Sequence, residues 1–222
     1  MIELSGIQKA YRRKVVLESV SLTAKEGSCV GILGGNGCGK STLLSILAGV
    51  QKADGGSFLC DDEDLLQNTE RRNALLGYVP QGNPLIEELN AWDNLRMWYD
   101  RRTLKQELDQ GVLAMLGIDG FLKIPVHKMS GGMKKRLSIG CAVAAKPKIL
   151  LLDEPSTALD LVCKEKIYNY FSAYRDEGGI LLLATHDLQE LALCDQCYIL
   201  KKGKLTSYEY DGDIHRLAGS LS

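Results

Sequence analysis

The sequence has little that would place it in a membrane or outside the cell. Nowhere does it hold eighteen consecutive apolar residues, and its best apolar runs, Ile149–Leu152 and Ile180–Ala184, have the length of strands. Its first six residues include the early acid Glu3 and no apolar block, so they do not resemble a secretory signal. We therefore expect a chain that cannot span a membrane by itself and that works in the cytoplasm.

A strong charge of either sign is also missing. The chain has 27 Lys and Arg against 28 Asp and Glu, a formal net charge of −1. This balance gives no support for binding nucleic acid through bulk charge, so we expect no nucleic-acid partner. The apolar and charged fractions, 45% and 25%, are ordinary for a globular protein, and 222 residues can bury a sizeable core.

The cysteines do not form a disulfide or metal framework. Their number, seven, is odd, and most lie inside apolar segments, as in a reduced cytosolic protein. Cys194 and Cys197 have the spacing of a redox or zinc pair, but no second pair accompanies them. We favour the interpretation that both are small buried residues.

The apolar pattern predicts an α/β fold with a mostly parallel sheet. From residue 149 onward, strand-like and helix-like segments alternate, which is typical of a parallel sheet covered by helices. Two opening extended segments, Ile2–Lys9 and Val15–Ala24, predict an antiparallel β subdomain. Further strands are expected at 28–33, 57–60, 75–79, 149–152, 180–184, 198–201 and 204–207, and helices at 40–48, 132–145, 161–177 and 187–193.

The stretch from about residue 82 to residue 128 is different, because it is helical and less regular. Trp92–Tyr99 and Leu104–Leu116 carry apolar residues at helical spacing. No linker, repeat or low-complexity tract divides the chain. We therefore predict a single domain over residues 1–222, with a helical subdomain at about 82–128 inserted into the α/β core.

The strongest local motif is a glycine-rich loop that matches Gly-x4-Gly-Lys-Ser. It follows an apolar strand and opens a helix, the context in which this motif binds phosphate rather than making an ordinary turn. We expect Lys40 to reach the β- and γ-phosphates of a nucleotide and the Ser41 hydroxyl to bind Mg²⁺. The expected nucleotide-binding residues of this loop are Gly34, Gly35, Asn36, Gly37, Cys38, Gly39, Lys40, Ser41 and Thr42.

Two adjacent acids follow the apolar strand Ile149–Leu152. Asp153 and Glu154 stand at the edge of the sheet where α/β proteins bind ligands. Alone, such a pair would be an ordinary solvated strand end. Together with the loop at Lys40, it predicts nucleotide hydrolysis, with Asp153 near Mg²⁺ and Glu154 as the base or positioner of the attacking water.

A third motif carries a family resemblance. Met129-Ser130-Gly131-Gly132-Met133 resembles the Leu-Ser-Gly-Gly-Gln signature of ATP-binding cassette (ABC) proteins, and it starts a helix before Asp153, as in that family. A Ser-Gly-Gly tripeptide alone is usually a helix cap. The resemblance implies the ABC ATPase fold, built on a P-loop NTPase core. It also implies that Ser130, Gly131 and Gly132 contact the γ-phosphate held by the opposite subunit of a head-to-tail homodimer or heterodimer.

Four further matches follow in the order of the family. The resemblance implies that Tyr11 stacks on adenine and that Gln81 contacts Mg²⁺ and acts with the catalytic residues. It implies that the loop 156–160, which ends at Asp160, crosses to the other subunit and that His186 bonds the γ-phosphate. Each residue alone would have an ordinary surface or cap role, so the resemblance rests on the order of the matches. The implied catalytic residues are Lys40, Gln81, Glu154 and His186.

The signature departs from the family pattern at two positions. Met129 replaces the usual leucine and Met133 the usual glutamine, so a polar contact of the glutamine amide is missing. Gly35 stands where proline is frequent, which removes no amide donor. Because Glu154 is intact, we expect an active ATPase that uses ATP and Mg²⁺.

The resemblance implies the ATPase subunit of a membrane transporter, peripheral on the cytoplasmic face of the cell membrane. A separate transmembrane permease is expected to dock near Gln81 and the helical subdomain. That region holds apolar residues for such a contact, although packing within the subdomain explains most of them at least as well. They are Leu85, Ile86, Leu89, Trp92 and Trp98.

The direction of transport is favoured by resemblance alone. The run from Met129 to Arg136 looks like that of exporter ATPases paired with six-helix permeases, and about twenty residues after Gly203 leave no room for the regulatory domain of many sugar importers. Export is therefore favoured, and no motif names a substrate. The alternative is a soluble cassette ATPase with a cytosolic partner, as in iron–sulfur cluster assembly. The retained Lys40, Asp153 and His186 argue against a non-catalytic regulator.

Overall fold

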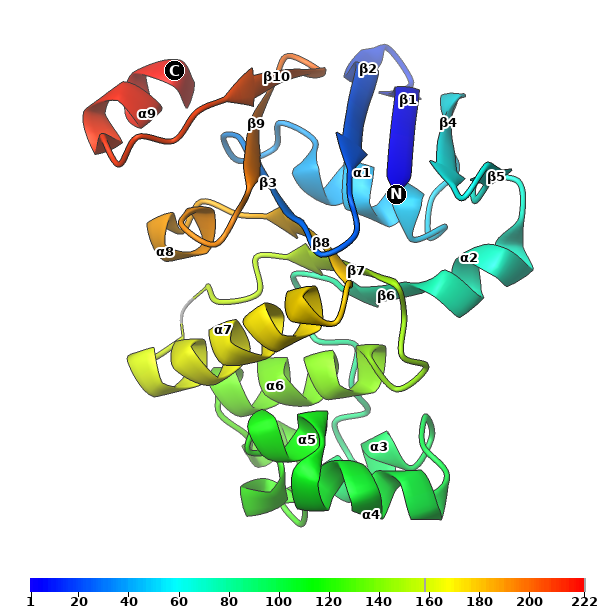
Figure 1. Ribbon diagram of the computed structural model, residues 1–222, viewed down its shortest axis with the longest axis vertical. Helices are drawn as coiled ribbons and strands as arrows, with labels where there is room; N and C mark the ends of the chain where they lie inside the picture. The colour runs from blue at the N-terminus through cyan, green and yellow to red at the C-terminus, as the bar shows by residue number, and fades with distance from the viewer. Residues whose placement is uncertain (158, 222) are drawn as a thin grey trace.

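The computed structural model describes residues 1–157 and 159–221. Within them the strands form one 10-stranded sheet in the order β5-β4-β1-β2-β10-β9-β3-β8-β7-β6 (Figure 1). The expected mixture of a parallel part and an antiparallel part is present.

The parallel part is built from strands that are far apart in the sequence. β3 (Cys29–Leu33) lies between β8 (Ile180–Ala184) and β9 (Gln196–Lys201), and β7 (Ile149–Asp153) lies between β8 and β6 (Leu76–Val79). All these pairings are parallel. The carboxyl ends of β3, β6, β7 and β8 therefore meet at one edge, where parallel sheets bind ligands.

The antiparallel part contains the first strands of the chain. β1 (Ile2–Tyr11) pairs with β2 (Lys14–Ala24) and β4 (Gly55–Cys60), and β4 with the short β5 (Glu63–Asp64). β10 (Lys204–Tyr208) is antiparallel to β9 and joins this part through one parallel register pair with β2. The last hairpin of the chain thus connects the two parts.

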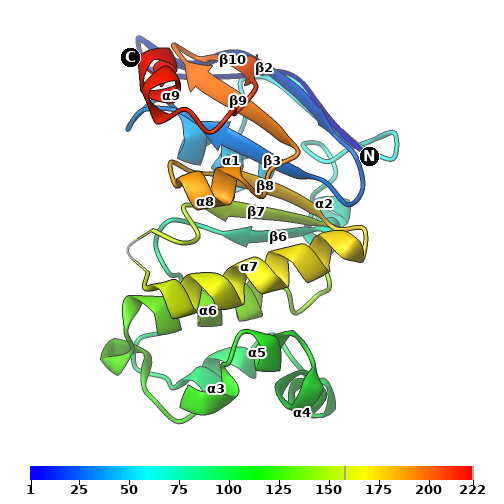
Figure 2. The same cartoon turned by 60° about the vertical axis from the view of Figure 1, so that its left-hand side comes forward.

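The central strands are buried on both faces because helices and β1–β2 cover them. On β7, Leu150 and Leu152 face one hydrophobic cluster and Ile149 and Leu151 face the other. The first cluster is completed by α6 (Gly131–Ala142) and α7 (Leu161–Asp176), and the second by α1 (Lys40–Leu47). Figure 2 shows α6 and α7 on one side of the strands and α1 on the other. This two-sided burial explains the continuous apolar runs.

Three short helices lie beyond α6, at the end of the molecule farthest from β1 (Figures 1 and 2). They are α3 (Ala91–Leu95), α4 (Arg101–Gln110) and α5 (Val112–Met115), with 3₁₀ turns at Asp119–Phe121 and Val126–Lys128. The segment 104–116, which reads as one apolar pattern, is broken at Gly111. The cause is Glu107, whose carboxylate accepts a hydrogen bond from the Val112 backbone N–H at 2.9 Å and so caps a new helix.

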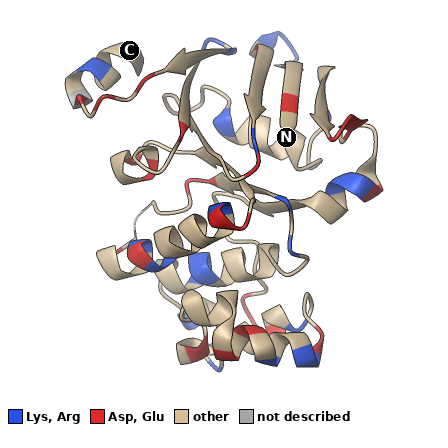
Figure 3. Ribbon diagram, in the orientation of Figure 1, with Lys and Arg blue, Asp and Glu red and all other residues tan. Residues whose placement is uncertain are grey.

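Three elements were not expected from the sequence: β5, α2 (Thr69–Leu75) and α9 (Ile214–Leu221). Helix α2 has no apolar stripe, but the Asn68 side chain caps it by accepting from the Arg71 backbone N–H. The short α8 (Leu188–Leu191) completes the fold. Within the described residues, no helix has the length and apolar character that crossing a bilayer needs. Lys and Arg are interspersed with Asp and Glu along the elements (Figure 3).

Candidate nucleotide site

The glycine-rich loop runs from the end of β3 into α1 at the carboxyl edge of the sheet. With Gln81, Glu154 and His186 it lines a cavity of about 690 Å³. Gly39 begins α1 with φ 116°, a left-handed conformation that favours glycine. A Cβ at Gly34 would lie 2.4 Å from the Cys38 Sγ, so the thiol packs against this glycine and is not in the cavity lining. Side chains at Gly34 and Gly39 would therefore strain this loop.

Lys40 lies inside this loop and is buried. Its ammonium donates hydrogen bonds to the Gly34 carbonyl at 2.7 Å and to the Gly35 carbonyl at 3.4 Å. These carbonyls keep the cation at the loop opening, in the position where phosphate oxygens would replace them.

Asp153 ends β7 below the cavity and is only 2% exposed. Burial raises the pKa of its carboxyl, and a hydrogen bond from Ser41 partly offsets the rise. The Asp153 carboxylate, the Ser41 hydroxyl and the Gln81 amide oxygen are hard oxygen donors, the set that Mg²⁺ prefers. The residues present thus fit a magnesium ion.

Glu154 is the centre of the hydrogen-bonding network. Its Oε2 accepts from Gln81 Nε2 at 3.0 Å and from the Thr157 hydroxyl at 3.3 Å, and its Oε1 lies 3.3 Å from His186 Nδ1. Its backbone N–H donates to the Ala184 carbonyl at 2.8 Å. The backbone of Glu154 has φ 49°, a strained conformation for a residue with a side chain. The fold thus holds this carboxylate in one place between β6, β7 and β8.

Two buried charged residues behind the cavity were missed by the sequence analysis. Lys135 of α6 donates to the carbonyls of Pro80 and Gln81 at 3.2 and 3.3 Å, and burial lowers the pKa of its ammonium. Glu190 of α8 is 1% exposed, and burial raises the pKa of its carboxyl, with hydrogen bonds from Ser156 and Thr185 opposing the rise. Lys135 therefore ties the helix of the signature to the segment of Gln81.

The charge run Lys134-Lys135-Arg136 gave no signal that two of its members point inward. Lys134 lies on the surface and pairs with Glu87 at 3.2 Å. Arg136 is buried, donates to the Leu116 carbonyl at 2.8 Å and stacks 5.0 Å from the Phe121 ring centroid. Only the helical period, applied to charged residues, could have suggested this division.

Several expected nucleotide-binding residues lie outside this cavity. Ser130 and Gly131 are exposed at the start of α6, where the Ser130 hydroxyl accepts from the Met133 backbone N–H at 3.2 Å. Asp160 caps α7 by accepting from the Cys163 backbone N–H at 2.8 Å. Tyr11 is 44% exposed and its hydroxyl bonds Gln51. Ala158, in the loop 156–160, lies outside the described residues.

The cysteine pair is partly buried, in line with its expected structural role. Cys197 is 6% exposed, and the Cys194 Sγ lies 3.4 Å from the Cys29 Sγ. All seven cysteines are free thiols. Within residues 1–157 and 159–221, no group of three His, Cys, Asp or Glu side chains could hold a metal ion.

Comparisons with known proteins place the chain in a family. The family model described as ABC transporter matches residues 17–157, which include the glycine-rich loop, Gln81, the signature, Asp153 and Glu154. The chain belongs to the ABC transporter family and is an ATP-binding cassette of the ATPase class.

Two curated relatives differ in the direction of transport that their names state. The chain is 34% identical over 97% of its length to the spermidine/putrescine import ATP-binding protein PotA of Mesoplasma florum. It is 32% identical over 91% of its length to the Nod factor export ATP-binding protein I of Sinorhizobium fredii. The chain spans 63% and 61% of the length of these two relatives.

A solved structure supports the fold. The dimeric, post-hydrolysis structure of the ATP-binding cassette MJ0796, bound to ADP and Pi, superimposes with a TM-score of 0.85 at 27% identity. The similarity covers 96% of this chain and 100% of that one. The expected ABC ATPase fold is confirmed.

Proposed function

We propose that this chain is the ATP-hydrolysing subunit of a membrane transporter and that two cassettes bind Mg·ATP between them, head to tail. The observation that carries the proposal is the division of the site. The loop of Lys40 and the acid Glu154 share one cavity, whereas Ser130 and Gly131 are exposed at a helix start outside it. A second cassette would bring its own helix start over the γ-phosphate.

In this proposal each residue has a distinct task. Lys40 and the loop N–H groups hold the phosphates, and Ser41, Asp153 and Gln81 would hold Mg²⁺, which would supply positive charge to neutralise the phosphates. Glu154 orients and deprotonates the attacking water, and His186 bonds the γ-phosphate. Gln81 and His186 already contact the Glu154 carboxylate, so a bound γ-phosphate and water would be held by the same network.

The dimer is tested with a variant that binds ATP without hydrolysing it. Glu154→Gln keeps the side-chain shape and removes the base, so we expect kcat to fall at least about 100-fold while Mg·ATP drives a dimer visible by light scattering after size exclusion. ADP should leave the chain monomeric. A Glu154→Gln chain that stays monomeric with saturating Mg·ATP would contradict the head-to-tail site.

Gly131 offers a matched control for the same experiment. A Cβ at Gly131 meets no atom within 4 Å, so Gly131→Glu should fold normally. Its carboxylate would face the partner's γ-phosphate, and we expect the Glu154→Gln Gly131→Glu chain to bind ATP as a monomer. A dimer of this double variant would show that Gly131 does not face the nucleotide.

The permease contact is proposed at the helical region near Gln81. Trp98 is 64% exposed and Ile86 44%, whereas Leu85 and Trp92 pack against the core cluster. We expect a tagged chain in mild detergent to retain a polytopic membrane protein in stoichiometric amount, and Trp98→Ser to lose it. Val50→Ser, at an equally exposed apolar site in another region, should keep it. A soluble partner instead would favour a cytosolic cassette ATPase.

Export is the narrower part of the proposal. It rests on the resemblance of the run 129–136 to exporter ATPases, because the relatives include an import protein and an export protein. Sequencing the captured permease tests it. A six-helix permease is expected, and an import permease with a separate substrate-binding protein would overturn it.

A further inference from the structure

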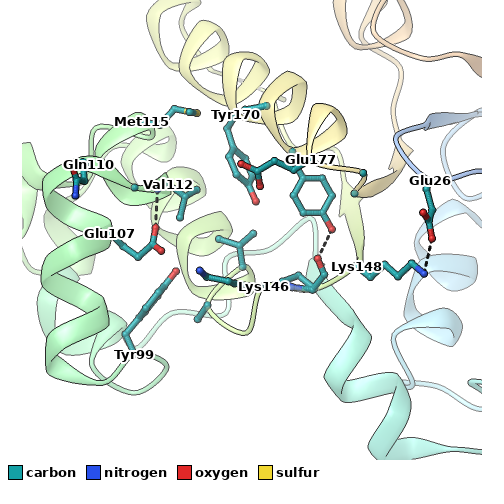
Figure 4. A pocket seen from close by; sticks show the side chains of 18 residues that line it. Glu26, Tyr99, Glu107, Gln110, Val112, Met115, Lys146, Lys148, Tyr170 and Glu177 are labelled. Atoms are coloured by element: carbon teal, nitrogen blue, oxygen red, sulfur yellow. Dashed lines mark hydrogen bonds and ion pairs between the residues drawn. The ribbon is translucent and has the colours of Figure 1, made fainter.

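A second cavity lies at the opposite edge of the sheet, at the amino ends of β7 and β8. It has a volume of about 590 Å³, and its lining includes Lys148 and Gly179, which directly precede those strands (Figure 4). This volume is in the range of small-molecule sites. The family match spans most of the residues that line this cavity but assigns it no role, and the proposed hydrolysis does not use it, so its chemistry must be derived from its own walls.

The backbone gives the cavity a negative potential. Three helices end at it, because the C-cap residues of α4, α6 and α7 all line it: Gly111, Val143 and Glu177. The last carbonyls of a helix lack partners within the helix, so the C-terminus of each helix carries about half a negative charge. Gly111 is also the N-cap of α5, whose start offsets the end of α4, so the ends of α6 and α7 are the ones that favour a cation.

The side chains of the walls carry both signs of charge, with three acids, Glu26, Glu107 and Glu177, and two lysines, Lys146 and Lys148. Glu107 and Glu177 line the cavity, and only one oxygen of Glu107 is bound, by the Val112 N–H. Lys148 is already paired with Glu26 at 2.8 Å and Asp61 at 2.9 Å. Lys146 also lines the cavity, and it forms no ion pair with any residue of the described chain. Its ammonium competes with any other cation for these walls.

Three tyrosines form the apolar part of the walls. Tyr99, Tyr170 and Tyr174 are 5%, 7% and 8% exposed, and the Tyr170 and Tyr174 rings are 5.9 Å apart between centroids at 50°. The Tyr99 and Tyr174 hydroxyls donate to the Gly140 and Pro147 carbonyls, each at 2.8 Å. The face of an aromatic ring attracts a cation.

Tyr170 differs from the other two because its hydroxyl has no hydrogen-bond partner in residues 1–157 and 159–221. The side chain reaches from α7 into the cavity (Figure 4). Burial is the main cause that raises the pKa of its phenol, followed by the neighbouring Tyr174 and Tyr99 and then by the charges of Glu177 and Glu107. Tyr170 is 7% exposed and its hydroxyl opens on the cavity, so it is free to accept a hydrogen bond from an N–H donor of a ligand.

We propose that this cavity is a ligand site for a protonated organic amine with an apolar body. The ammonium would donate to the Tyr170 hydroxyl and the free oxygen of Glu107, with the helix ends behind them, and the apolar body would lie against the tyrosine rings and Met115. The site is separate from the nucleotide site, and it does not depend on the proposed transport.

The charge requirement is tested with three probes of one shape. Isothermal titration calorimetry of the full chain would compare 2-phenylethylammonium, the neutral 2-phenylethanol and the anionic phenylacetate at constant ionic strength. We expect the amine to bind at least about tenfold more tightly than the alcohol, and phenylacetate not to bind. Equal binding of amine and alcohol, or no binding of the amine, would overturn the proposal.

The location is tested with variants of the walls. Tyr170→Phe removes only the hydroxyl and should weaken the amine about fivefold, the effect of one hydrogen bond. Tyr168→Phe is the matched control on α7, because the Tyr168 hydroxyl donates to Ser156 at 3.1 Å, outside this cavity. Lys146→Met should strengthen amine binding several fold by removing the competing ammonium. A Lys146→Met chain that binds no better than wild type would contradict the electrostatic argument.

Independence from the nucleotide site separates this proposal from the proposed function. Lys40→Ala should lose nucleotide binding and keep the amine affinity of the wild type. Amine binding that saturating ATP abolishes by direct competition would place the amine in the nucleotide cavity and overturn the second site.

Discussion

The two edges of the parallel sheet present opposite chemistry. At the carboxyl edge, the start of α1 and the buried Lys40 make a cavity suited to phosphate. At the amino edge, the ends of α4, α6 and α7 meet Glu107, Glu177 and three tyrosines. A helix that leads into a strand of a parallel sheet runs antiparallel to that strand. Such helices therefore begin at one edge of the sheet, which favours anions, and end at the other edge, which favours cations.

Replacing a lysine at each edge should give the largest difference between them. Lys40→Ala removes the charge held inside the phosphate loop, and we expect kcat/KM for ATP to fall at least about 100-fold in a phosphate-release assay. Lys148→Ala removes a surface ion-pair partner at the amino edge and should leave kcat/KM unchanged. Unchanged turnover in Lys40→Ala would mean that the phosphate loop is wrongly assigned.

Lys135 allows a finer comparison of the two edges, because it connects α6 to the carboxyl edge and not to the amino edge. In Lys135→Met the carbonyls of Pro80 and Gln81 lose their donor, and Gln81 no longer holds Glu154 in place. We expect kcat to fall about tenfold with little change in the KM for ATP, and Lys135→Arg to recover part of the loss. A rise in KM at constant kcat would instead make Lys135 a nucleotide-binding residue.

Replacing Tyr11 tests whether an aromatic ring contacts the ligand at the carboxyl edge, as we propose for the tyrosine rings at the amino edge. Its ring is 44% exposed, and its hydroxyl bonds Gln51. Tyr11→Ala should raise the KM for ATP about fivefold, the loss of one stacking contact of about 1 kcal/mol, and Tyr11→Phe should keep the wild-type value. An unchanged KM in Tyr11→Ala would reject the stacking role.

The acids of the two edges should respond to pH with opposite sign. Hydrogen bonds to Lys148 lower the pKa of Glu26 and Asp61, so their contribution to stability is present above their ordinary pKa and is lost as the pH falls through the lowered one. Burial raises the pKa of Asp153, so its ionisation costs stability increasingly as the pH rises from 3.8 through the raised value.

Asp153→Asn is the smallest of these effects. Neutralising the buried carboxylate should raise the Tm of the nucleotide-free chain by a few degrees at pH 7 and by less at pH 4, with ATP turnover lost. Differential scanning calorimetry at the two pH values measures this. An equal rise at both values would mean that charge burial is not the cause.

The sequence predicted the central strands and the phosphate site because their signals are local. The run Ile149–Leu152 is apolar at every position, and the loop of Lys40 has fixed spacing between a strand and a helix. The roles of the individual site residues, among them Lys40, Glu154 and His186, remain predictions. The limits of the helical subdomain, at about residues 82 and 128, also remain a prediction.

The buried charged residues and the second cavity could not be predicted, because they depend on packing between segments that are far apart in the sequence. Lys135 and Arg136 stand in a basic run that reads as a solvated surface, and only the positions of Gln81 and Leu116 turn them inward. The second cavity combines Glu107, Tyr170 and Lys146, which no local pattern relates to one another. Such sites have no sequence signal short of the folded structure.

The position of β3 has a consequence for the order of folding. β3 is made early in synthesis, but both of its neighbours, β8 and β9, come from residues 180–201. The edge of β2 likewise stays unpaired until β10 has been synthesised. The emerging chain therefore carries an apolar strand with two open edges until most of the protein has left the ribosome. Open edges of this kind bind chaperones or aggregate, and pairings over such sequence distances form slowly. Mutations in β9 and β10 should consequently reduce the yield of folded protein more than their contacts with the finished site would suggest.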